Sequence, residues 1–219
     1  MARGVGLPED DAFITALKEN HSSYLRMNYY PICGIKDEDP STLGISPHKD
    51  AGFLTVLLQD DDCHSLQAEV DGEWILAHPV PGALTINTGD MAQIWSNGKY
   101  KAPLHRVLAD QRRKRYSAPF FYNPGYRTFV QPFVAAGSDS SKDNYRKCLW
   151  GYFRAVRFAG DLTDLGVEIQ IDDYEKANDI RSAHLDRQDE FYNEGHCDVP
   201  FDVEHYENLI EKYPCVENE

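Results

Sequence analysis

The sequence predicts a mainly β fold with helices appended toward its C-terminal end. Two observations support this prediction. Short runs of strand-forming residues, separated by turn signals, fill residues 24–122, and apolar residues at helical spacing dominate only from about Tyr145 onward. A series of short strands between turns is typical of an antiparallel sandwich or barrel, and it disfavours alternating βαβ units.

The first elements are a helix and two strands. Residues 7–20 open with Leu-Pro and two acidic residues, which favours a helix start. Residues 24–31 predict a strand that Pro31 stops. Residues 53–58 form an unbroken run of strand formers, and further strands are predicted at residues 65–70, 73–80, 83–89, 90–98, 100–108 and 115–122.

Turn residues indicate how these strands connect. Asp71-Gly72 is a two-residue hairpin signal between two of them. A polar turn at Asp110 separates residues 100–108 from residues 115–122. A hairpin centred on that turn would place the two strands side by side in one sheet.

The C-terminal part of the chain has a helical character. Apolar residues recur at helical spacing from Leu149 to Val156, and further helices are predicted near residues 189–192 and 204–213. We therefore expect three regions: an N-terminal helical segment at residues 1–23, a β core at residues 24–124, and a C-terminal strand, helical and acidic tail region at residues 125–219.

Charge is distributed unevenly along the 219 residues. The whole net charge of −14 lies in residues 161–219, which hold 18 acidic and 4 basic residues. This excess disfavours a nucleic-acid partner, because phosphate binding needs the opposite sign. We interpret the segment as a solvated acidic helical tail.

The cysteines are scattered without paired spacing, at Cys33, Cys63, Cys148, Cys197 and Cys215. This pattern predicts reduced thiols and a cytoplasmic location rather than a disulfide framework or a zinc site. The sequence has neither an apolar run of membrane-spanning length nor a signal pattern at its start, so we expect no membrane partner. A monomer is the favoured oligomeric state.

A candidate metal site lies in residues 46–61. His48 and Asp50 are separated by one residue, and residues i and i+2 of a strand point to the same face. His105, in a strand-like run 55 positions after Asp50, is the candidate third ligand. Two imidazoles and one carboxylate form the triad that suits non-haem Fe(II) and leaves positions open. Taken alone, a histidine such as His105 is more often a core or edge residue with a satisfied hydrogen bond than a ligand.

Two more i, i+2 pairs lie on predicted strands. Arg115 and Ser117 follow the polar turn, where an inward guanidinium and hydroxyl can bind a carboxylate. Asn28 and Tyr30 can likewise hold a carboxylate or orient a metal ligand. The alternatives are a solvated basic hairpin tip that includes Arg115 and an ordinary core tyrosine at Tyr30.

In combination these motifs resemble a known family. The pattern HxD…H…RxS has NYYP upstream and PGALTINTGDMAQIWSNGKYKAPLHRV in its middle. It is similar to the plant-type 2-oxoglutarate/Fe(II)-dependent dioxygenases, whose superfamily includes isopenicillin N synthase and aminocyclopropane-carboxylate oxidase. The resemblance runs from about residue 7 to residue 166. Members usually carry a sizeable region before this segment, so we expect this chain to lack most of that N-terminal region.

The resemblance implies a double-stranded β-helix, or jelly-roll, core and a dioxygenase activity. Such an enzyme hydroxylates or desaturates a small organic metabolite with O2 and releases succinate and CO2. The resemblance places Fe(II) and the cosubstrate 2-oxoglutarate on specific residues. The iron ligands would be His48, Asp50 and His105, and 2-oxoglutarate would be bound by Arg115 and Ser117, with Tyr30 and Asn28 assisting.

The segment NTGDMAQIWSNG also matches the family, and we interpret its glycines and Asp90 as turn-forming residues. Trp95 and Phe121 are expected in the core or the pocket wall.

Two alternatives to the dioxygenase stay open. One is a same-fold Fe(II) oxidase that does not use 2-oxoglutarate, and the other is a truncated, non-catalytic module. The substrate is not specified, because pocket walls vary freely within one fold.

Overall fold

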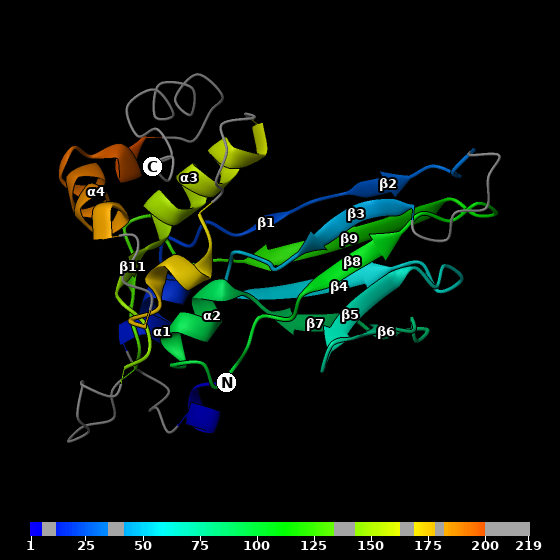
Figure 1. Ribbon diagram of the computed structural model, residues 1–219, viewed down its shortest axis with the longest axis horizontal. Coiled ribbons are helices and arrows are strands. Elements are labelled where there is room, and N and C mark those ends of the chain that lie inside the picture. The colour runs from blue at the N-terminus through cyan, green and yellow to red at the C-terminus, as the bar shows by residue number, and fades with distance from the viewer. Residues whose placement is uncertain (6–11, 35–41, 134–142, 163–168, 178–181, 200–219) are drawn as a thin grey trace. The chain divides into compact units, whose positions relative to one another are not determined.

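The computed structural model describes residues 1–5, 12–34, 42–133, 143–162, 169–177 and 182–199. They form two compact units (Figure 1). The described residues of 23–93 and 100–123 form the first, called the β unit below. The described residues of 1–22, 94–99 and 124–199 belong to the second, called the helical unit.

Nine strands form two antiparallel sheets in the described part of the β unit (Figure 1). They are β1 (Tyr24–Leu25), β2 (Asn28–Tyr30), β3 (Leu43–His48), β4 (Leu54–Gln59), β5 (Leu66–Val70), β6 (Glu73–Leu76), β7 (Thr85–Thr88), β8 (His105–Leu108) and β9 (Arg115–Tyr122). The first sheet has the order β1-β9-β4-β7, with β2 also paired to β9. The second sheet has the order β3-β8-β5-β6.

Burial alternates along β9, as expected for a strand with two different faces. Arg115, Ser117 and Pro119 are buried, whereas Tyr116 and Phe120 are exposed. The buried set lines a cavity within the β unit. The strand therefore delivers every second side chain to the same interior space.

The hairpin predicted at Asp71-Gly72 is confirmed. It joins β5 to β6, with Val70 opposite Glu73. The backbone φ angle is 53° at Asp71 and 85° at Gly72. Two consecutive positive φ angles are what a two-residue type I′ turn requires, and Asp-Gly tolerates them at low cost.

The hairpin predicted around Asp110 is wrong as a strand pairing, although the turn is present. Oδ1 of Asp110 accepts hydrogen bonds from the amides of Arg112 (2.7 Å) and Arg113 (2.9 Å). Strand β8 nevertheless pairs with β3 and β5, and β9 pairs with β4, β1 and β2. Because both edges of each strand are occupied, His105 and Arg115 lie in different sheets.

Two other segments differ from their predicted form. The strand predicted over residues 24–31 is divided into β1 and β2 by Arg26 and Met27. Residues 90–98 were predicted as a strand, but they contain the helix α2 (Asp90–Trp95). The residues from Met91 to Trp95 are all buried, so the segment has no alternation of buried and exposed positions that would distinguish a strand from a short buried helix.

The described part of the helical unit contains three α-helices and a two-stranded sheet. Its elements are η1 (Ala2–Val5), α1 (Ala12–Lys18), β10 (Phe129–Val130), β11 (Cys148–Leu149), α3 (Trp150–Leu162), η3 (Ile171–Tyr174), α4 (Ser182–Asn193) and η5 (His196–Asp198). Helices α3 and α4 confirm the helices predicted from Leu149 onward and at residues 189–192. The helix predicted at residues 204–213, and the predicted helix start at residues 7–11, lie outside the described residues.

Large side chains from distant parts of the sequence fill the interior of the helical unit. Trp150, Tyr152, Phe153, Tyr174 and Phe191 are each at most 1% exposed. The four described cysteines are free thiols, as predicted. No described helix combines the length and the apolar character that crossing a bilayer requires.

Candidate metal centre

His48 and His105 face each other across the ladder between β3 and β8. Nδ1 of His48 lies 2.8 Å from the carbonyl oxygen of Ser46, and Nδ1 of His105 lies 3.1 Å from that of Pro103. A carbonyl oxygen can only accept, so Nδ1–H is the donor in both rings. In a neutral imidazole with Nδ1 protonated, the lone pair is on Nε2, which is a tautomer that binds metals.

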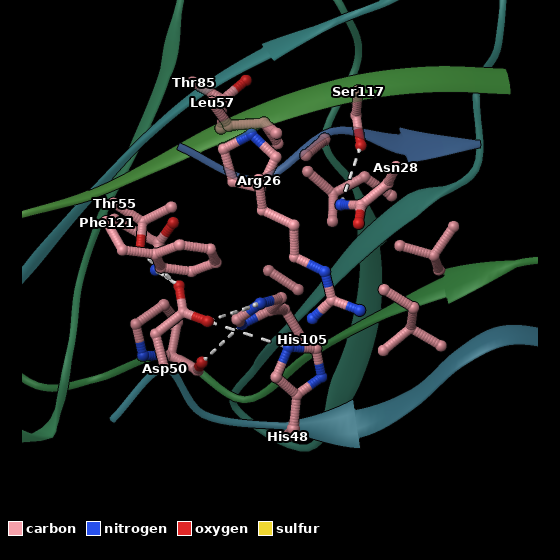
Figure 2. Close-up of a pocket in the computed structure, with 18 of the residues that line it drawn as sticks. Arg26, Asn28, His48, Asp50, Thr55, Leu57, Thr85, His105, Ser117 and Phe121 are labelled. Atoms are coloured by element: carbon pink, nitrogen blue, oxygen red, sulfur yellow. Dashed lines mark hydrogen bonds and ion pairs between the residues drawn. The ribbon is translucent and has the colours of Figure 1, made fainter. Parts of the chain in front are cut away.

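Asp50 lies in the turn after β3 rather than on the strand, so the predicted i, i+2 strand geometry is wrong in detail. The turn still brings its carboxylate to the histidines (Figure 2). Oδ1 of Asp50 is 3.7 Å from Nε2 of His48 and 3.7 Å from Nε2 of His105. Oδ2 accepts hydrogen bonds from Oγ1 of Thr55 (2.6 Å) and Nδ2 of Asn87 (2.7 Å). One oxygen is thus anchored to the protein and the other faces the two imidazoles.

Backbone contacts hold the turn that carries Asp50. The amides of Asp90 and Met91, at the start of α2, donate to the carbonyls of Asp50 (2.8 Å) and Gly52 (3.0 Å). A Cβ atom at Gly89 would lie 2.2 Å from the Gly52 oxygen and 2.7 Å from the Asp50 oxygen. Gly89 is therefore needed for close backbone approach, whereas the turn role predicted from φ freedom fits Gly98, whose φ is 83°.

The three predicted ligands come together as one group. One donor atom from each of His48, Asp50 and His105 lies within 4.8 Å of the others. Asp50 is 8% exposed and His105 is 15% exposed, while His48, at 35%, is the most exposed of the three. Two imidazole nitrogens and one carboxylate oxygen form the donor set of non-haem Fe(II) sites. The arrangement can hold such an ion, and the hydrogen bonds that orient its ligands are already made.

Arg115 is buried, with 2% of its surface exposed. Its Nη1 donates to Oγ of Ser117 (3.3 Å), and its Nη2 donates to Oε1 of Gln59 (3.1 Å). Its Nε is buried without a hydrogen-bond partner, and both partners of the guanidinium in the described part of the chain are neutral. A buried cation without a counter-charge is unfavourable, so the site fits a carboxylate supplied by a ligand.

The pair predicted to assist Arg115 lies on the neighbouring strand. Asn28 is the register partner of Ser117, and Tyr30 is the register partner of Arg115. Nδ2 of Asn28 donates to Oγ of Ser117 at 3.4 Å. The Arg115 guanidinium carbon lies 4.9 Å from the centroid of the Tyr30 ring, a distance typical of a cation–π contact. The structure thus brings all four predicted residues together.

The basic run before Arg115 behaves differently. Arg112, Arg113 and Lys114 are exposed, as a solvated tip predicts. Of the four consecutive basic residues, only Arg115 points inward. Strand β9 begins only at Arg115, so the three residues before it lie outside the strand, whereas Arg115 is the first residue on its buried face.

A cavity of about 240 Å³ joins the two groups of residues (Figure 2). Its walls include all seven predicted site residues, together with Phe121, and both sheets of the β unit contribute to it. Trp95 is 1% exposed and belongs to the core, not to this wall.

Sequence reasoning missed four residues of this region: Thr55, Asn87, Gln59 and Arg26. Strand alternation was a usable signal for three of them. Thr55 and Gln59 share a face of β4, and Arg26 precedes Asn28 and Tyr30 with the same spacing of two. The role of Asn87 depends on a contact 37 positions away, which no local pattern indicates.

Residues 21–124 match the model of the 2OG-Fe(II) oxygenase superfamily. The chain carries a domain of this superfamily. The match includes the three candidate metal ligands and the group formed by Asn28, Tyr30, Arg115 and Ser117. The resemblance predicted from the sequence is therefore confirmed. The family is named for Fe(II) and 2-oxoglutarate, so the cofactors expected from the sequence are confirmed at the family level.

Curated relatives agree with this assignment. The chain is 36% identical over 163 residues to 1-aminocyclopropane-1-carboxylate oxidase 5 of Arabidopsis thaliana, which covers 71% of this chain and 52% of the relative. It is 41% identical over 172 residues to Jasmonate-induced oxygenase 2 of Arabidopsis thaliana, which covers 78% of this chain and 46% of the relative. The chain therefore spans about half the length of these relatives.

Solved structures confirm the jelly-roll fold. JOX2 in complex with 2OG, Fe and JA superposes with a TM-score of 0.63 at 38% identity, over 70% of this chain and 44% of JOX2. A full-length Neurospora crassa protein in complex with alpha-KG superposes with a TM-score of 0.64 at 26% identity, over 72% of this chain and 50% of that protein.

Proposed function

We propose that this chain is the catalytic portion of an Fe(II)- and 2-oxoglutarate-dependent dioxygenase that oxidises a small organic molecule. One observation carries the proposal: a two-histidine, one-carboxylate group shares a cavity with a buried arginine that lacks a counter-charge among the described residues. The first group suits Fe(II), and the second suits the far carboxylate of 2-oxoglutarate. A cofactor and cosubstrate of these chemistries would satisfy both at once.

Each residue then has a defined role. His48, Asp50 and His105 would hold Fe(II), with Thr55 and Asn87 orienting the carboxylate. Arg115 and Ser117 would bind the far carboxylate of 2-oxoglutarate, supported by Asn28 and Tyr30. Bound iron would supply the coupling of O2 reduction to the oxidative decarboxylation of 2-oxoglutarate, which would yield succinate and CO2. The apolar remainder of the cavity would keep bulk water from the reacting atoms.

The test is succinate release by the purified chain supplied with Fe(II), ascorbate and 2-oxoglutarate, first alone and then with a library of small organic molecules. We expect slow uncoupled release that a substrate stimulates, and no release from Asp50→Ala protein that remains folded. Iron binding without succinate under any condition would favour the same-fold oxidase that does not use 2-oxoglutarate. Loss of both iron and 2-oxoglutarate binding would favour a non-catalytic module.

We further propose that the β core at residues 24–124 carries all of the chemistry and that the regions on either side of it do not take part. The free thiols support a cytoplasmic location. We also propose that the protein acts as a monomer, since all proposed ligands come from one chain, and size-exclusion chromatography with light scattering tests this.

A further inference from the structure

Two exposed histidines meet at the end of the β5–β6 hairpin that lies opposite its turn (Figure 1). His64 comes two residues before β5, and His78 comes two residues after β6. Their Nδ1 atoms are 3.1 Å apart, and their ring centroids are 5.3 Å apart. Within the described part of the chain, neither ring makes any other hydrogen bond or ion pair. Neither residue lines the cavity that holds the metal triad, so the pair is a separate feature of the β unit.

The backbone beneath both rings is fixed by the sheet. Next to His78, the amide of Ala77 donates to the carbonyl of Leu66 at 2.9 Å, which extends the β5–β6 ladder by one residue pair. His78 also precedes a proline, which restricts its backbone to extended conformations. Next to His64, Ser65 is only 3% exposed and anchors the chain in the interior. The two imidazoles therefore start from positions that the fold holds in place.

The spacing of the two nitrogens fits a metal ion bound by both. A zinc–imidazole bond is about 2.0–2.1 Å long, so two such nitrogens lie about 2.9 Å apart at a right angle and about 3.3–3.4 Å apart at the tetrahedral angle. The observed 3.1 Å falls between these values. Imidazole suits Zn(II), Cu(II) and Ni(II), whereas Mg(II) prefers oxygen ligands. The pair thus has the donor type and the separation that such ions need.

The same spacing fits a hydrogen bond in which one Nδ1–H donates to the other Nδ1. Such a bond between exposed rings contributes little net stability, because water competes for both nitrogens. For a metal to bind both Nδ1 atoms, the donating ring must carry its proton on Nε2 instead. Both residues are exposed, so water can move that proton, and two neutral rings then bind the ion without a net loss of protons.

We propose that His64 and His78 form a second metal site, which takes a divalent transition ion of the Zn(II), Ni(II) or Cu(II) type through both Nδ1 atoms. Water would fill the remaining positions, because among the described residues only the triad forms a group of three or more metal ligands. The ion would join the start of β5 to the end of β6, where Leu66 and Ala77 line the cavity. This inference does not depend on the proposed dioxygenase function.

The experiment separates this site from the triad. Untagged protein with His48→Ala and Asp50→Ala keeps only one of the three triad ligands and serves as the background. Into it we would introduce His64→Gln, His78→Gln or the matched control His21→Gln, which removes an exposed histidine of the helical unit. Calorimetry measures the binding of Zn(II), Ni(II) and Mg(II), and circular dichroism checks that each variant folds.

The background protein and its His21→Gln variant should bind one Zn(II) or one Ni(II) at this pair in preference to Mg(II). His64→Gln and His78→Gln should each weaken Zn(II) binding about tenfold or more, because even residues that only orient a ligand contribute at that scale. Three results would overturn the inference: no Zn(II) binding by the background protein, an affinity that survives in His64→Gln or His78→Gln, or an equal loss in His21→Gln.

A second measurement uses the parent protein and so does not depend on the folding of any variant. Proton–nitrogen correlation spectra of the imidazoles distinguish coordination through Nδ1 from coordination through Nε2. With Zn(II) in excess of both sites, His64 and His78 should bind it through Nδ1. His48 and His105 should bind it through Nε2, since their Nδ1–H groups donate to carbonyl oxygens. If the His64 and His78 signals do not change, the pair is only a hydrogen bond and the proposal fails.

Discussion

Thr55 donates a 2.6 Å hydrogen bond to Oδ2 of Asp50. Asn87 donates a second hydrogen bond to the same oxygen at 2.7 Å. Because Oδ2 is occupied, Oδ1 is the oxygen that lies 3.7 Å from Nε2 of both histidines. Two neutral side chains therefore decide which carboxylate oxygen is presented to a metal.

Thr55→Val keeps the shape of this side chain and removes its hydroxyl. We expect Fe(II) or Mn(II) affinity to fall about tenfold or more, because partners that orient a ligand contribute at that scale. The measurement is metal titration by calorimetry. Thr85→Val is the matched control, because its hydroxyl also lies in the cavity but accepts from Gln59 instead of contacting Asp50. Equal losses for the two variants would mean that Thr55 acts only through general packing.

Gly89→Ala should disturb the metal site without touching a ligand. The added Cβ would lie 2.2 Å from the carbonyl oxygen of Gly52, and backbone atoms cannot move aside cheaply. We expect the turn that carries Asp50 to shift and metal affinity to fall. Gly34→Ala is the control, since nothing lies within 4 Å of its added Cβ. A Gly89→Ala protein with parental melting temperature and metal affinity would refute the close-approach argument.

Arg115→Lys should weaken 2-oxoglutarate binding by about tenfold or more, because a point charge cannot replace the bidentate fork. Ser117→Ala should weaken it less, by about 1 kcal/mol, since one hydroxyl contact is lost. Arg113→Ala, at the exposed tip, should change it very little. Titration of the Fe(II) chelate absorbance measures all three. Equal losses at Arg113 and Arg115 would indicate a diffuse basic patch, and no loss at Arg115 would favour an oxidase that does not use 2-oxoglutarate.

Cys197 in the helical unit should react slowly with alkylating reagents. Burial raises the pKa of its thiol to about 11, with the carboxylate of Asp198 adding to the rise and Arg127 opposing it. The folded pKa lies above the unfolded one, so the stability that this thiol contributes is present at neutral pH and is lost as the pH rises toward 11. Mass spectrometry of iodoacetamide labelling should find slow modification at about pH 8 that accelerates at higher pH. Equal rates in native and urea-unfolded protein would contradict this.

Local patterns in the sequence were sufficient for several features. The Asp71-Gly72 turn, the strand β4 and the helix α3 depend on neighbours within a few positions, and all three are present. The inward direction of Arg115 also followed from local alternation, because a strand turns every second side chain to one face. The candidate metal triad was indicated by its residue types, which suit non-haem Fe(II), together with the family resemblance.

Strand pairing was decided only in the tertiary structure. The turn at Asp110 is local and was predicted, yet the strands on its two sides belong to different sheets. A turn limits the direction of the chain, but it does not specify which edge the next strand joins. That choice depends on the strands that are already paired, and β4, the neighbour of β9, lies far earlier in the chain.

The sequence by itself determined which residues we propose to carry the chemistry, from their types, their positions on predicted strands and the family resemblance. Tertiary structure decided how those groups are held. Thr55 and Asn87 reach Asp50 from β4 and β7, and Gln59 reaches Arg115 across 56 positions. The bonds made by Asn87 and Gln59 join residues far apart in the chain, and such bonds leave no periodic trace in the sequence. They exist only once the sheets have brought their strands together.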